Sequence, residues 1–198
     1  MKKLLTALMV LAAAVSLQAN TEGYVMLSVW HPGQIPIATT SLDGVRLNLL
    51  YGECQNLNGF DLGIAGRVRE RMNGFQLGGA NLIGTDACGA QIAFANYVEN
   101  DYTGFQLGFW NYIGGEGSGC QIGLWNESTK NFTGFEMGLV NRAESFSGFQ
   151  LGLWNRAYTG NFLQIGLVNY TEHLDGVQIG LLNFATSQWT LPFINVAW

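Results

Sequence analysis

Charged residues, and basic ones above all, are scarce in this chain, and that scarcity excludes several classes of function. Only 12% of the 198 residues are charged, and nine Lys and Arg stand against fourteen Asp and Glu. A net-acidic chain without a Lys/Arg cluster has no electrostatic surface for nucleic acid, so we expect no DNA or RNA partner. Low charge beside 27 Gly and 13% aromatic residues is also unlike a helical bundle, and it favours strands joined by tight turns.

The residues that most often build catalytic and metal sites are few and badly spaced. His31 and His173 are far apart in the sequence, and Cys54, Cys88 and Cys120 lack metal-ligand spacing. The odd number of cysteines leaves open whether one pair forms a disulfide. The chain contains no nucleophile elbow, phosphate loop, calcium repeat or paired-carboxylate motif. We therefore expect no catalytic residue, no metal ligand and no cofactor, and predict that the protein is not an enzyme.

What the chain does contain is a short phrase, Gly-Phe-Gln-Leu-Gly-Leu-Trp-Asn, repeated ten times. We number the positions of each copy from its first residue. The copies begin at Gly44, Gly59, Gly74, Gly89, Gly104, Gly119, Gly134, Gly148, Phe162 and Gly176. Successive starts are 15 residues apart at first and 14 apart over the last three intervals. A nearly constant short period predicts one structural unit stacked on itself, in which each unit supplies core to its neighbours.

Each copy has the alternating pattern of a strand with two different faces. Positions 2, 4 and 6 are apolar with few exceptions, position 3 is Gln in seven copies, and position 5 is mostly Gly. Period-two alternation indicates a half-buried strand. We expect positions 2, 4 and 6 to face inward and the Gln and Gly rows to face outward. One more apolar residue, shortly before the next copy, is expected to point inward as well.

Position 8 is Asn in eight copies, and we interpret this row as structural. Identical side chains line up when identical strands stack in register, and their amides can then hydrogen bond along the stack. Asn also tolerates the backbone needed at a corner. The predicted ladder consists of Asn81, Asn96, Asn111, Asn126, Asn141, Asn155, Asn169 and Asn183.

The predicted fold class is all-β, a β-solenoid of about ten coils of 14–15 residues, capped at both ends. We assign residues 1–19 to a secretory signal peptide, 20–43 to an N-terminal strand and cap, 44–185 to the solenoid and 186–198 to a C-terminal cap. Lys2 and Lys3 followed by an apolar run and Ala19 support the signal peptide. The alternating C-terminus leaves a small outer-membrane β-barrel as an alternative, although a barrel hairpin requires about 22 residues or more.

Position 7 is the one row that core packing does not obviously require. It holds Trp110, Trp125 and Trp154 in later copies and Ala in several early ones. On a regular strand these side chains would point outward, where an aromatic stripe beside a glycine furrow could bind sugar, lipid or a partner protein. The other interpretation is that the chain bends here and packs the Trp side chains at the corner.

The repeats Gly148–Asn155 and Leu163–Asn169 resemble those of bacterial cell-surface short-repeat proteins of the form G-[FLV]-Q-[IL]-G-L-[VW]-N. The resemblance covers most of residues 25–195. It implies export and carries no established catalytic residues. We expect a non-enzymatic structural or interaction module in the periplasm, outer membrane or cell surface of a Gram-negative bacterium. Its partner would be an envelope protein or a glycan, with a homo-oligomer through the sheet face as a further option and a carbohydrate-binding module using the Trp stripe as the alternative.

Overall fold

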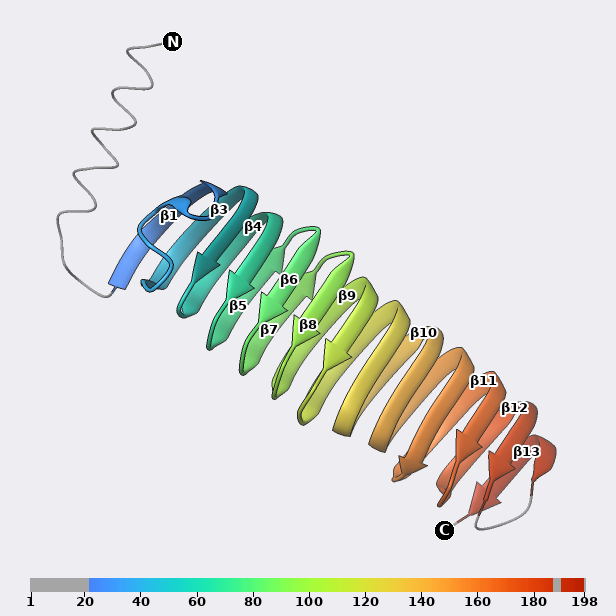
Figure 1. Ribbon diagram of the computed structural model, residues 1–198. Helices are drawn as coiled ribbons and strands as arrows, with labels where there is room; N and C mark the ends of the chain where they lie inside the picture. Colours follow the sequence, from blue (N-terminus) through green and yellow to red (C-terminus); the bar gives the residue numbers. More distant parts are fainter. Residues whose placement is uncertain (1–21, 187–189, 198) are drawn as a thin grey trace, which may run out of the picture.

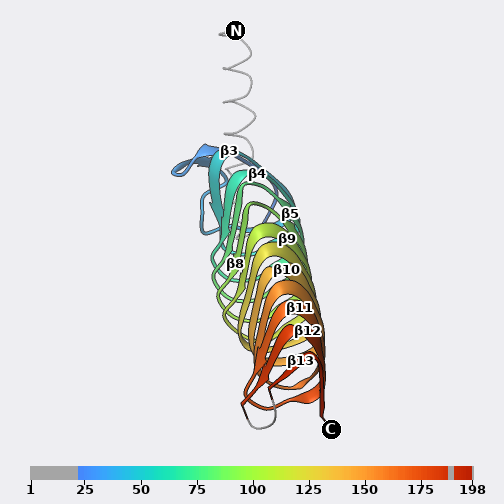
Figure 2. The ribbon, with the colours of Figure 1, turned by 90° about the vertical axis from the view of Figure 1, so that its right-hand side faces the viewer.

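The computed structural model describes residues 22–186 and 190–197. These residues form a rod of stacked coils, with the first and last strands at opposite ends of the rod (Figure 1). Viewed closer to its axis, the rod shows each coil as a flattened loop nested on the next (Figure 2). The predicted all-β solenoid is confirmed. The expected signal peptide, residues 1–19, lies outside the described residues.

In the part of the chain that the structure describes, thirteen strands belong to one sheet system. They are β1 (Glu22–Trp30), β2 (Gly33–Ile35), β3 (Ser41–Cys54), β4 (Leu57–Val68), β5 (Met72–Leu77), β6 (Ala80–Ile83), β7 (Ala87–Ile92), β8 (Ala95–Val98), β9 (Tyr102–Ile113), β10 (Gly117–Thr159), β11 (Asn161–Thr171), β12 (Asp175–Ala185) and β13 (Leu191–Ala197). β10 continues around several coils without interruption because its corners keep extended backbone. The sheet winds about the rod axis from one end to the other and is not a barrel.

Equivalent positions of successive coils pair in parallel, as the repeat predicts. Trp110 lies opposite Trp125 and Asn111 opposite Asn126, and the 14-residue coils keep the register, with Gly148 opposite Phe162 and Phe162 opposite Gly176. Antiparallel strands stand at the two ends: β2 pairs with β1, and β13 pairs with β12. They occupy the sheet edges that would otherwise be open to further pairing.

The expected inside and outside of the coil are reversed. The Gln side chains at position 3 are fully buried, whereas the apolar residues at positions 2, 4 and 6 face outward and many are about half exposed, such as Phe60 at 58% and Leu124 at 46%. The prediction was wrong because alternation identifies two faces without saying which one is inside. Stacked amides satisfy one another from coil to coil, so a Gln row can be buried without orphaned polar groups.

The apolar core consists of two other rows. One is the residue two places before each copy, which was expected to point inward and includes Leu57, Met72, Tyr102, Phe132 and Phe146. The second lies at position 10, with Val68, Ile83, Val98 and Ile113 among its members. The rings of Phe132 and Phe146 stack with centroids 5.9 Å apart. The interior therefore contains two apolar rows and two amide rows.

Glycine stands at position 1 in nine of the ten copies, where it makes the turn toward the inward position 3, and Phe162 is the exception. At Gly104 the backbone φ angle is 142°, a value that L side chains rarely adopt. A Cβ atom there would also lie 1.9 Å from the carbonyl oxygen of Gly89 in the preceding coil. The repeated Gly is thus a requirement of the close stacking of coils.

Candidate functional site: an apolar face with a central groove

The outward side chains at positions 2, 4, 6 and 7 form one continuous surface, which we call the apolar face. From the copy that starts at Gly59 onward, no charged, amide or hydroxyl side chain occurs at any of these positions. The face runs along the coils of the rod. Contiguous exposed apolar surface on this scale is unusual for a monomeric soluble domain, so this face is the candidate site.

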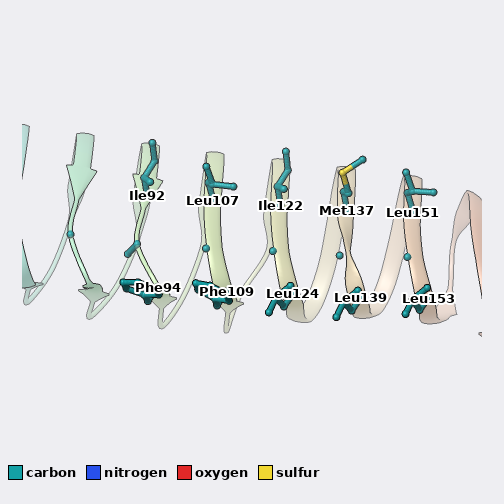
Figure 3. A pocket seen from close by; sticks show the side chains of 16 residues that line it. Ile92, Phe94, Leu107, Phe109, Ile122, Leu124, Met137, Leu139, Leu151 and Leu153 are labelled. Carbon is teal, nitrogen blue, oxygen red and sulfur yellow. The ribbon is translucent and has the colours of Figure 1, made fainter.

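A groove runs along the middle of this face over five coils, from Ile92 to Leu153. Figure 3 shows its two walls as parallel rows of side chains on either side of the glycine positions. One wall comes from position 4 and the other from position 6. Their members are Ile92, Leu107, Ile122, Met137 and Leu151, and Phe94, Phe109, Leu124, Leu139 and Leu153. The groove has a volume of about 860 Å³, and its position 6 side chains are 46–66% exposed.

The floor of the groove is the glycine row at position 5, and the Asn ladder underneath explains it. A Cβ atom at Gly123 would lie 2.6 Å from the carbonyl oxygen of Gly108 and 2.7 Å from Nδ2 of Asn111. A side chain at position 5 would therefore have to enter space that the asparagine amides already fill. Ala93 is the exception in this row, and the bond from Asn81 Nδ2 to the neighbouring carbonyl oxygen of Ile92 is 3.5 Å long, against about 3 Å in other coils.

The eight asparagines of the expected ladder lie inside the coil and form an unbroken chain of hydrogen bonds. Nδ2 of each Asn donates to Oδ1 of the next, from Asn81 through to Asn183, at 2.8–2.9 Å. The second Nδ2 hydrogen reaches a position 4 carbonyl oxygen of the next coil, as from Asn111 to Ile122 at 2.9 Å. The ladder thus supports the groove from below, and its side chains are buried.

The Trp side chains at position 7 lie outside, along one border of the apolar face. Trp110, Trp125 and Trp154 are 42%, 43% and 52% exposed, so they do not pack into the corner. Nε1 of Trp125 donates to a carboxylate oxygen of Glu127 at 3.3 Å, which directs the polar edge of this indole away from the groove. The row is interrupted by Val140 and starts only after three Ala-containing coils, so it is a partial stripe.

The Gln row, which was expected to face outward, is a buried ladder, and between Gln76 and Gln178 it contains one ionisable residue. Each Gln Nε2 donates to a side-chain oxygen at position 3 of the preceding coil, for example Gln106 to Oε1 of Gln91 at 2.8 Å. Glu136 replaces Gln in this row. It accepts from Gln150 at 2.6 Å, while its Oε1 has no partner among the described residues. Burial raises the pKa of Glu136 to about 8, and the protonated form has the donor that the row requires.

The row ends in a buried ion pair on the N-terminal side. Asp61 accepts from Gln76 at 3.0 Å and from two nitrogens of Arg46, at 2.9 and 2.6 Å. Both charged side chains are almost fully buried. Nη1 of Arg46 also donates to the carbonyl oxygen of Arg67 in the neighbouring coil at 2.8 Å, and we interpret this pair as a structural terminus of the Gln row.

The other polar side chains of the described residues do not assemble into a reaction centre. No group of three or more His, Cys, Asp or Glu that could hold a metal ion occurs in the part of the chain that the structure describes. Cys54 is buried and Cys88 is exposed, and the three cysteines are free thiols. Among residues 22–186 and 190–197, no helix is long and apolar enough to cross a membrane.

Comparison with known proteins leaves the apolar face as the main guide to function. No family model, curated protein or solved structure matches this chain. The resemblance to bacterial surface repeat proteins stays a prediction drawn from the repeat itself.

Proposed function

We propose that this protein is a non-enzymatic interaction module, exported to the bacterial cell envelope, that binds through its apolar face. The single observation that supports this most strongly is the apolar face itself. The rod buries Gln and Asn and leaves Phe, Leu, Ile and Trp side chains outside. These apolar side chains add hydrophobic stabilisation only if another apolar surface covers them.

Carbohydrate binding through the Trp stripe has weaker support. Sugars stack on aromatic rings but also require polar groups that hydrogen bond to their hydroxyls. The rows beside the Trp side chains at positions 4, 5 and 6 supply none. Polar side chains lie on the other side of the Trp row, at position 9, and there Glu127 already accepts hydrogen bonds from the Trp125 indole and from Arg142.

Cell fractionation tests the proposal. We expect the chain expressed in a Gram-negative host to lose residues 1–19, measured by mass spectrometry, and to sediment with the envelope. The variant Leu124→Lys places a charge in the groove, and it should release the protein into the soluble exported fraction. Asn131→Lys adds the same charge to the exposed polar side of the same coil and serves as the matched control. An uncleaved chain in the cytoplasm would refute export, and equal sedimentation of both variants would refute binding through the face.

A further inference from the structure

We propose that the surface which covers the apolar face is lipid: the rod lies flat on a membrane, with the groove walls among the acyl chains. This inference rests on the proposed function and names the partner of the same face. It depends on four properties of the described residues: the chemistry of the groove, the order of residues around the coil, the length of the rod and the sign of its charge.

The groove offers no hydrogen bond to an occupant. All sixteen lining residues are Gly, Ala, Leu, Ile, Met or Phe. The peptide groups of the floor bond to neighbouring coils, as Ala93 N does to Leu107 O at 3.0 Å and Phe109 N to Phe94 O at 2.9 Å. Protein–protein interfaces usually carry about ten direct hydrogen bonds, and a peptide that adds a strand requires a free sheet edge. Hydrocarbon chains require neither.

The residues around each coil follow the polarity of a membrane interface. Beyond position 6 comes the Trp row, and position 9 holds Tyr97, Tyr112 and Tyr170 together with charged residues. The tyrosine rings of 97 and 112 stack with centroids 4.8 Å apart. Trp and Tyr concentrate at the headgroup level of membranes because one end of each ring is apolar and the other polar. The hydrogen bond from Trp125 to Glu127 gives that orientation.

The length of the rod requires it to lie along the surface. Ten coils stacked about 4.8 Å apart extend to about 45 Å or more, which exceeds the roughly 30 Å of bilayer hydrocarbon. The polar side of the coils also continues along the rod, so a spanning orientation would bury its charges. A flat rod with one apolar side resembles an amphipathic helix that lies in the interface plane.

The charge of the chain indicates which lipids are needed. Without Lys2 and Lys3 of the expected signal peptide, seven basic residues remain against fourteen acidic ones, a net charge of −7. Attraction to anionic lipid requires clusters of free Lys and Arg. Arg67, Arg69 and Arg71 are close in sequence, but Arg69 pairs with Glu53 and Arg71 with Asp86. Binding should therefore depend on apolar burial alone, require no anionic lipid and persist at high salt.

Vesicle flotation with the mature chain tests this. We expect the protein to float with neutral phosphatidylcholine vesicles at low and high salt, and added phosphatidylglycerol should not strengthen binding. Emission from the Trp row should be quenched by brominated acyl chains. Leu124→Lys should lower binding at least about tenfold, whereas Asn131→Lys should leave it unchanged. Circular dichroism and melting curves of both variants control for folding.

The alternatives give different results. If the protein does not float, yet Leu124→Lys still releases it from the envelope, the lipid inference is wrong and the proposed function stands with a protein partner. If sedimentation shows a dimer that Leu124→Lys dissociates, the face is covered by a second copy. If neither variant changes vesicle binding or envelope sedimentation, both proposals fail.

Discussion

Two neighbouring residues of strand β9, one polar and one apolar, lie on opposite sides of the coil wall. Gln106 lies inside the coil, fully buried, and bonds to the Gln residues before and after it. Leu107 lies outside and is 38% exposed. The fold depends on the buried polar side chain, whereas the apolar side chain is left partly exposed on the apolar face. The comparison teaches that hydrophobicity alone does not locate the core of a solenoid. Identical stacked amides hydrogen bond to one another from coil to coil, so they can be buried as packed hydrocarbon can.

The largest effect should come from breaking the inner row. Gln106→Ala removes both of its ladder bonds and leaves a buried acceptor on Gln91 and a buried donor on Gln121. Each such group costs about 1–3 kcal/mol, so we expect a loss of about 2–6 kcal/mol in unfolding free energy. Leu107→Ala, in contrast, should cost less than about 1 kcal/mol because its side chain is already exposed. Urea denaturation of both variants measures the contrast, and equal losses would contradict the assignment of inside and outside.

The next effect is the pH dependence produced by Glu136. Its pKa rises from about 4.5 in the unfolded chain to about 8 on burial, so folding takes up a proton between these values and stability falls as pH rises through that window. Glu136→Gln supplies a permanent donor to Gln121. Above pH 8 we expect it to be more stable than the natural chain by about 1–3 kcal/mol, with little difference near pH 4.5.

Melting temperatures recorded across this pH range measure the gap between the two proteins. The exposed Glu144→Gln serves as the charge-matched control and should follow the natural chain at every pH. A gap for Glu136→Gln that does not widen with pH would show that Glu136 is already ionised in the folded state.

A smaller effect is expected at the floor of the groove. Gly123→Ala places a methyl group against the carbonyl of Gly108 and the amide of Asn111. Ala93 shows that the row accepts a methyl with a longer Asn81 bond, so the loss should be about 1 kcal/mol. Differential scanning calorimetry measures it. An unchanged or raised melting temperature would indicate that the floor has room that the structure does not show.

The three cysteines provide a test that leaves stability unchanged. Cys88 is exposed, Cys120 at position 2 is half-buried, and Cys54 is buried with its pKa raised to about 11 by burial. We expect a water-soluble thiol reagent to label Cys88 first, Cys120 more slowly and Cys54 only after unfolding. Mass spectrometry of timed samples gives the order. If Cys120 were protected from the reagent as fully as Cys54, position 2 would face the interior and the assignment of inside and outside would be wrong.

Much of this fold was predictable from the sequence, because the repeat specifies register without ambiguity. The correct inside was also present in the pattern. Counting in twos from an inward residue such as Tyr102 passes Gly104 and reaches Gln106, so one apolar residue placed inside forces Gln inside as well. The groove was less accessible to prediction, since it depends on how the chain bends at position 5 and on the asparagines beneath it. Whether the Trp side chains point outward or pack at the corner could not be decided until the bend was known.

The two amide ladders run in opposite senses. Gln amides donate toward the N-terminus and Asn amides toward the C-terminus, and the Gln chain begins on Asp61 and ends where Asn195 of β13 donates to Gln178 at 3.4 Å. Apart from Glu136, the special residues of the Gln row belong to its ends, and the coils that carry Gln and Asn present the same groups above and below. One such Gln and Asn coil could therefore be added or removed between the ends without leaving a further donor or acceptor unmatched. Rod length could change by steps of one coil, with the same two termini kept.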